Sequence, residues 1–113
     1  MQIISKIQRK KFANGDCCTI YEYPMEDCDI NGAVISLSGR YPDKGWAINE
    51  ICKEMGYIVS GSGKLVVEGK EYELSAGDLV LINPGEKFYW EGNMEIFMPC
   101  TPAWDSGQYK FID

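Results

Sequence analysis

The chain has 113 residues, a formal net charge of −6, and a composition that is 45% hydrophobic and 12% aromatic. This length corresponds to one domain with a core of its own, and the acidic balance excludes a nucleic-acid partner, which would need a clustered basic face. No apolar stretch reaches the roughly 20 residues of a membrane span, and the first eleven residues lack the apolar centre of a signal peptide. We therefore expect no membrane partner and a cytoplasmic location.

The five cysteines fit that location because their number is odd and Cys17 and Cys18 are neighbours. Neighbouring side chains point to opposite faces of a strand, so the pattern is not that of a disulfide framework. We expect most thiols to be reduced and the buried ones to pack as small apolar groups.

The first half of the chain predicts short strands separated by polar turns. Alternation, together with β-branched and aromatic residues, indicates strands at residues 2–7, 17–23, 31–39, 46–49 and 55–59. In the third of these, Ala33, Ile35 and Leu37 share one face. The Ser-Gly-Ser-Gly tract at residues 60–63 then predicts a hairpin turn.

The second half contains four glycines spaced eight residues apart, at positions 61, 69, 77 and 85. Between and after them, strand-forming runs occupy residues 64–68, 70–74, 78–82, 87–90 and 94–98, and residues 101–113 form a tail in which Trp104 anchors the chain to the core. No segment has a sustained helical period. The pattern predicts an all-β barrel or sandwich with little helix.

Residues 77–93 (GDLVLINPGEKFYWEGN) resemble the second sequence motif of the cupin family, with Gly77 and Gly85 on its two glycine positions. Upstream, Glu54 precedes Gly61 by seven positions, as the glutamate of the first cupin motif precedes its glycine. The resemblance covers about residues 39–98. It implies a cupin-like double-stranded β-helix, a jelly-roll barrel, whose core spans about residues 30–100 of a single domain of residues 1–113.

The resemblance also raises the question of a metal, which metal-binding cupins hold with three histidines and a glutamate. This chain has no histidine. The three histidine positions fall on Ala47, Asn49 and Phe88, and only the glutamate is kept, as Glu54. One carboxylate and one amide oxygen cannot hold a soft or borderline divalent ion tightly. We therefore expect no metal and no other cofactor.

If the inward positions of the family carry over, Asn49, Glu54 and Phe88 face a cavity, and period-two alternation adds Trp90 beside Phe88. Trp46 lies in a flanking segment that covers an opening or forms an interface. These five residues are the predicted ligand-binding set, with Glu54 as the catalytic candidate. The plain alternatives are that Phe88 and Trp90 fill a solid core and that Glu54 lies at a strand end, where it is solvated or paired with Lys53 or Lys64.

Four functional hypotheses follow. The leading one is a metal-independent protein that binds a small polar or sugar-like molecule in an aromatic cup with Glu54 at its base. The second is a metal-free isomerase, epimerase or lyase with Glu54 as its acid–base group and Tyr57 or Tyr89 as its partner. The third is an atypical metalloenzyme with Glu54 and Cys52 among its ligands. The fourth is a filled barrel that acts through its surface.

The N-terminal strands also carry a hypothesis about assembly. Small barrels must cover their exposed sheet edges, and cupins commonly pair through such edges. We expect a homodimer in which residues 2–23 cross to the partner and bury Ile4, Ile20 and Tyr23.

Overall fold

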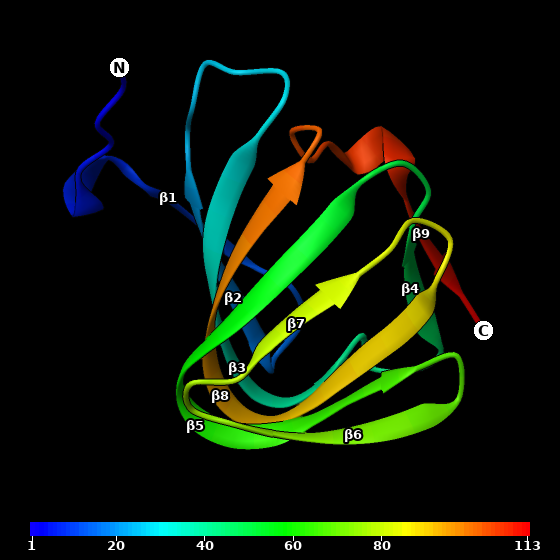
Figure 1. The fold of residues 1–113 in the computed structure, drawn as a ribbon. Helices are drawn as coiled ribbons and strands as arrows, with labels where there is room; N and C mark the ends of the chain where they lie inside the picture. Colours follow the sequence, from blue (N-terminus) through cyan, green and yellow to red (C-terminus); the bar gives the residue numbers. More distant parts are fainter.

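The computed structural model describes residues 1–113, and strands make up most of it (Figure 1). The helical pieces are two 3₁₀ turns, η1 (Lys6–Gln8) and η2 (Ser106–Gln108). The strands are β1 (Lys10–Ala13), β2 (Cys18–Tyr23), β3 (Asn31–Tyr41), β4 (Trp46–Asn49), β5 (Lys53–Val67), β6 (Lys70–Ser75), β7 (Leu79–Ile82), β8 (Lys87–Thr101) and β9 (Tyr109–Ile112). The expected all-β architecture with little helix is confirmed.

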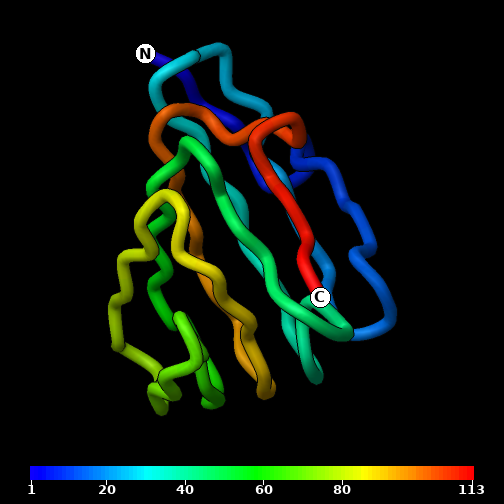
Figure 2. The backbone as a smooth tube through the Cα atoms, turned by 90° about the vertical axis from the view of Figure 1, so that its right-hand side faces the viewer, coloured from blue at the N-terminus to red at the C-terminus, as the bar shows by residue number.

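Strand β8 is the centre of the sheet. β3 runs antiparallel along one edge of β8, from Asn31 opposite Cys100 to Tyr41 opposite Trp90, and β5 runs along the other edge. β4 follows β3 beside the beginning of β8, while β6 and β7 pair with the far edge of β5. Because β3, β5 and β8 all bend, the sheet curls into a half-open jelly-roll barrel (Figures 1 and 2).

The predicted hairpin turn at residues 60–63 is wrong, because β5 continues through this tract after a bulge between Ile58 and Ser60. Within it, Gly63 stands opposite Gly92 of β8, and Gly92 stands opposite Gly39 of β3. A Cβ atom on Gly63 would lie only 2.4 Å from the carbonyl oxygen of Glu91. The glycines therefore permit the close backbone approach at which the sheet turns its corner.

Both ends of the chain also differ from the prediction. Residues 2–7 form no strand, and the first strand is β1, which pairs with β2 inside the same chain. The predicted tail, residues 101–113, contains a strand: β9 pairs antiparallel with β4, from Trp46 opposite Ile112 to Asn49 opposite Tyr109. The β4–β9 pairing joins segments far apart in the sequence, so local patterns do not reveal it.

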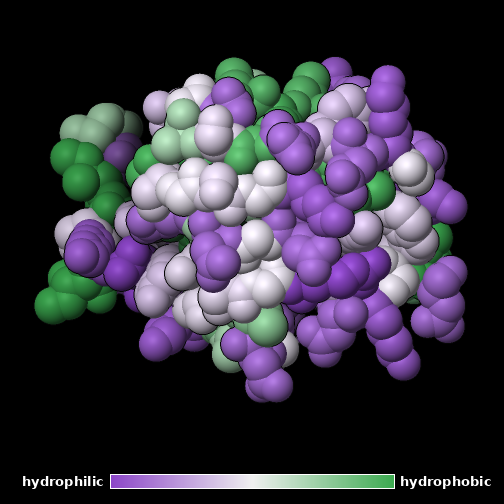
Figure 3. All heavy atoms as spheres, turned by 90° about the horizontal axis from the view of Figure 1, so that it is seen from below, coloured by the Kyte–Doolittle hydropathy of each residue, from purple (hydrophilic) through white to green (hydrophobic).

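The core lies on the concave side of the curled sheet. Along β8, alternate residues point inward, and the buried ones are Phe88, Trp90, Met94, Ile96, Met98 and Cys100. Seen from below, the closed end of the barrel is mostly hydrophilic or neutral, with apolar residues toward its margins (Figure 3). The structure contains no helix of the length and apolarity that a membrane crossing requires.

Candidate functional site

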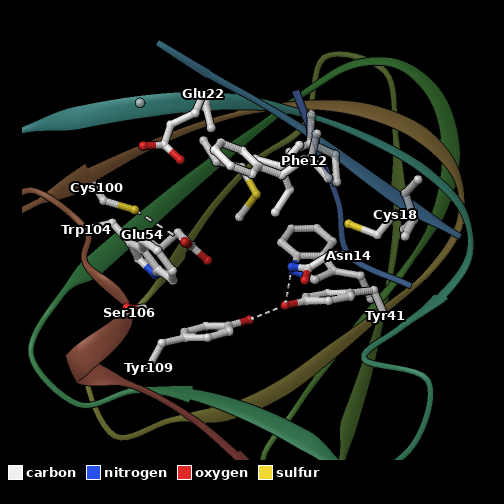
Figure 4. A pocket seen from close by; sticks show the side chains of 18 of the residues that line it. Phe12, Asn14, Cys18, Glu22, Tyr41, Glu54, Cys100, Trp104, Ser106 and Tyr109 are labelled. Atoms are coloured by element: carbon white, nitrogen blue, oxygen red, sulfur yellow. Dashed lines mark hydrogen bonds between the residues drawn. The ribbon is translucent and has the colours of Figure 1, made fainter. Parts of the chain in front are cut away.

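A cavity of about 510 Å³ lies on the concave side of the sheet. One wall comes from β1, β2 and β3, and the other comes from β8, β9 and the segment that joins them, with Glu54 of β5 beside Cys100 and Trp104 (Figure 4). Most of the lining is hydrophobic. The barrel is therefore hollow rather than filled, which leaves room for a small molecule.

The first wall follows directly from strand register. Cys18, Ile20 and Glu22 of β2 line the cavity, and they stand opposite Leu37, Ile35 and Ala33 of β3. Paired residues of an antiparallel sheet point to the same face, so the apolar face predicted for β3 is the inner face. Ile20 is consequently turned into the cavity of its own chain rather than outward toward a partner.

Glu54 is the most buried charged group of the site, with 9% of its surface exposed. The thiol of Cys100 donates a hydrogen bond to Glu54 Oε2 over 3.3 Å. Burial raises the pKa of the Glu54 carboxyl, while the hydrogen bond from Cys100 and the amide of Asn49 partly oppose that shift. Lys53 is exposed and Lys64 pairs with Glu71 and Glu91, so neither lysine neutralises Glu54.

Two tyrosine hydroxyls form a second polar feature of the cavity. The hydroxyl oxygens of Tyr41 and Tyr109 lie 3.2 Å apart, and Asn14 Nδ2 donates to Tyr41 Oη over 2.9 Å (Figure 4). Burial raises the pKa of Tyr41 to about 12 and raises the pKa of Tyr109 well above its ordinary value. Both hydroxyls therefore remain protonated at neutral pH and can donate hydrogen bonds.

Asn49 lies behind the cavity wall and fastens the C-terminal segment to it. Its Oδ1 accepts hydrogen bonds from Gln108 Nε2 at 2.8 Å and from Trp104 Nε1 at 3.2 Å. Gln108 Oε1 in turn accepts the backbone N–H groups of Ile51 and Cys52, each over 3.1 Å. Asn49 Nδ2 has no hydrogen-bond partner, yet its amide favours the ionised form of Glu54 by lowering the pKa of that carboxyl.

The structure brings three of the five predicted residues together: Glu54, Phe88 and Trp90 all line the cavity. Asn49 is fully buried just behind them. Trp46 does not reach the cavity, because Ala47 and Asn49 are the inward residues of β4 and Trp46 therefore points outward. There its ring packs against that of Tyr89, with the ring centroids 5.2 Å apart.

Neither tyrosine named as an acid–base partner is placed to assist Glu54. Tyr57 lies on the outer face with 43% of its surface exposed, and Tyr89 stacks under the guanidinium of Arg40. The sequence analysis missed Glu22 and Tyr109. Alternation linked Glu22 to Ile20, but nothing local showed that this face is the inner one.

The donors at the family's metal positions do not fit a metal centre. Ala47 and Phe88 are buried apolar residues that stand opposite each other in the β4–β8 register. Cys52 donates its thiol proton to the carbonyl of Pro102 over 3.3 Å, and burial raises the pKa of the Cys52 and Cys100 thiols. A thiol binds metal as the thiolate, and no three His, Cys, Asp or Glu side chains converge.

Comparison with known proteins agrees with this architecture. Residues 43–97 match the family described as the cupin domain, whereas no curated protein matches the sequence. Pac13, a nucleoside dehydratase from Streptomyces, superposes with a TM-score of 0.90 at 17% identity, over 99% of this chain and 91% of that chain.

Two further structures superpose over nearly their whole length. KdgF from Halomonas sp. has a TM-score of 0.74 at 15% identity, over 95% of this chain and 98% of that chain. An RmlC-like cupin from Shewanella frigidimarina has a TM-score of 0.74 at 17% identity, over 95% and 96%. At such identities the likeness shows the fold alone. The domain match over residues 43–97 and the shared fold both agree with the cupin resemblance of the sequence.

Proposed function

We propose that this chain is a small-molecule-binding cupin that works without a metal, and that the cavity lined by Glu54 is its binding site. The observation that carries the proposal is the hollow barrel itself, in which an apolar and aromatic lining surrounds a few convergent polar groups. Glu54 and the Tyr41–Tyr109 pair can orient a ligand by hydrogen bonds, while Phe88 and Trp90 hold its apolar surface.

The similar structures support the general class of this proposal. One is described as a nucleoside dehydratase, and another is an ectoine synthase from P. lautus, with a TM-score of 0.69. The same fold thus accommodates enzymes that act on small molecules. A fold does not specify which molecule is bound, so the choice of ligand has to come from the cavity of this chain.

A metabolite screen by thermal unfolding tests the binding proposal. Molecules that bind only the native state raise the melting temperature, and filling the cavity should abolish that rise. We therefore expect hits with the wild type that are lost in Ala33→Phe, whose new ring would enter the cavity. Val34→Phe, on the opposite face of the same strand, is the matched control and should keep the hits. Hits that survive in Ala33→Phe would place the binding site elsewhere, and a screen without hits would contradict the proposal.

Metal independence is tested separately by elemental mass spectrometry of protein purified without a histidine tag. We expect substoichiometric Fe, Mn, Ni, Cu and Zn, and unchanged binding after treatment with a chelator. A stoichiometric metal that the chelator removes together with ligand binding would contradict this part of the proposal.

A metal-free lyase or isomerase is the second candidate, and the tyrosine pair favours it. General acid–base chemistry needs a second titratable group near the first, and Tyr41 and Tyr109 face the same cavity as Glu54 (Figure 4). Each hit of the screen should be incubated with the protein and followed by NMR for chemical change. If the protein is such an enzyme, Glu54→Gln should lower turnover by about 100-fold or more while ligand binding persists.

A further inference from the structure

The charged groups of the cavity are all of one sign. Its lining contains two carboxylates, Glu22 and Glu54, and no lysine or arginine. Neither carboxylate takes part in any of the three ion pairs of the chain. Lys10 stands opposite Glu22 in the β1–β2 register, but it is exposed and does not line the cavity.

Glu54 is the more deeply buried of the two carboxyl groups. Nine tenths of its surface is buried, and Figure 4 shows its carboxylate pointing into the cavity. The Cys100 thiol donates a hydrogen bond to Oε2, and the amide of Asn49 also favours the ionised carboxylate, but no cationic side chain pairs with it. Burying an ionised carboxylate without a cation costs desolvation free energy. A ligand with a cationic group would therefore form an ion pair with Glu54 when it enters the cavity.

Aromatic rings surround the same space. The cavity-lining aromatic residues are Phe12, Tyr41, Phe88, Trp90, Trp104, Tyr109 and Phe111. Three of them form an edge-to-face cluster, in which the ring of Tyr109 lies 5.3 Å from that of Trp104 and 5.2 Å from that of Phe111. The faces of aromatic rings attract cations, most strongly where water is excluded.

We propose that the ligand of this cavity is a small organic cation, an amine or a quaternary ammonium compound with an apolar body, rather than a phosphate, a carboxylate or a neutral sugar. The inference rests on the proposed binding function and narrows it to one ligand class. Glu54 is the counter-ion of the bound cation, the aromatic rings enclose its apolar body and charged head, and Glu22 adds negative potential from the β2 wall.

The affinity of the cavity for a cation should depend on pH, because it depends on the ionisation of Glu54 and of the titratable groups that face it. They are Cys100 of β8, Cys52 before β5, Tyr41 of β3 and Tyr109 of β9, and none of them carries a positive charge in any state. A cation binds the ionised form of Glu54, so its binding releases a proton from the fraction of Glu54 that is protonated. The affinity for an amine should therefore rise as the pH rises through the pKa of Glu54.

Three ligands that share a phenyl ring and differ in charge test the proposal: a cation, a neutral molecule and an anion. The probes are 2-phenylethylamine, 2-phenylethanol and phenylacetate, titrated into the wild type by calorimetry at neutral pH. We expect the amine to bind at least tenfold more tightly than the alcohol and the acid to bind most weakly. Glu54→Gln should remove most of the preference for the amine. Glu95→Gln removes the same charge from the exposed face of β8, so it should leave the preference unchanged.

Several outcomes would overturn the ligand class. These are an alcohol or acid that binds as tightly as the amine, a preference for the amine that Glu54→Gln does not change, and an absence of measurable binding by all three probes. The proposed binding function is tested separately, by the metabolite screen with the wild type and Ala33→Phe. A neutral nucleoside or sugar that binds in that screen and is lost in Ala33→Phe would keep the binding function and exclude the cation. Far-UV circular dichroism of each variant confirms that it is folded.

Discussion

At the scale of single residues, Glu54 dominates the chemistry of this protein because it is a carboxylate that the fold places in an apolar cavity without a cation. Its neighbours donate hydrogen bonds or carry no charge. The balance between burial and these neighbours raises the pKa of the carboxyl. When such a group is ionised, we expect it to lower the stability of the folded chain. We also expect it to bind a ligand that supplies the missing positive charge.

The pH dependence of stability reports this state directly. Because the pKa of Glu54 is higher in the folded chain than its ordinary value of 4.5, the folded state binds more protons above pH 4.5. The contribution of Glu54 to stability is thus full below pH 4.5 and is lost as the pH rises toward its folded pKa. In this window we expect the free energy of unfolding of the wild type to fall relative to that of Glu54→Gln, by up to about 1.4 kcal/mol per pH unit.

Urea unfolding of both proteins at a series of pH values measures this difference. Glu95→Gln, on the exposed face of the sheet, serves as the control and should track the wild type. A difference between the wild type and Glu54→Gln that does not change with pH would show that Glu54 has the same pKa in both states.

At the scale of elements, the curvature that creates the cavity depends on the glycine corner of β3, β8 and β5. Gly63→Ala would place a Cβ atom 2.4 Å from the carbonyl oxygen of Glu91, and the two strands would have to separate. We expect this substitution to lower the free energy of unfolding by more than about 2 kcal/mol. Ser62→Ala, at the neighbouring exposed position, should change it by less than about 0.5 kcal/mol. Equal effects in chemical denaturation would mean that the corner tolerates side chains.

The second element that shapes the site is the C-terminal segment, which Gln108 and Asn49 hold in place. Gln108→Ala would leave the buried N–H group of Cys52 and the partly buried N–H group of Ile51 without their acceptor. Each such loss costs about 1–3 kcal/mol, so we expect a marked loss of stability and faster amide hydrogen exchange at Ile51 and Cys52. Lys110→Ala removes only an exposed ion pair with Glu50 and should have little effect. Unchanged exchange at both amides in Gln108→Ala would contradict the anchoring role.

At the scale of the whole molecule, the assembly state remains a prediction. Ile20, one of the three residues expected at a dimer interface, lines the cavity of its own chain. Apolar side chains are nevertheless exposed on the outer faces of β5 and β7, including Tyr57, Leu79 and Leu81. We still expect a homodimer, with twice the chain mass of 12.8 kDa. Light scattering at micromolar concentration measures this mass, and a monomer would contradict the expectation.

The sequence by itself determined the strand content, the all-β class and the identity of several inward residues. Glycine and proline positions and two-residue alternation are local signals, and they correctly placed β2, β4, β6 and β7 to within a residue or two. The cupin resemblance predicted that Glu54 and Phe88 face one cavity, because both fall on motif positions whose side chains point inward in the family. The complete lack of histidine could likewise be read without a structure.

Only the tertiary structure decided what surrounds Glu54. Tyr41, Tyr109 and Glu22 come from β3, β9 and β2, which meet because the sheet curls and because β9 pairs with β4. Pairing between distant strands depends on which surfaces fit in three dimensions, and no local pattern encodes that choice. The same reason explains why the tract at residues 60–63 was wrongly predicted as a hairpin turn. Whether a glycine marks a turn or a close approach of two strands depends on the strand that pairs with it.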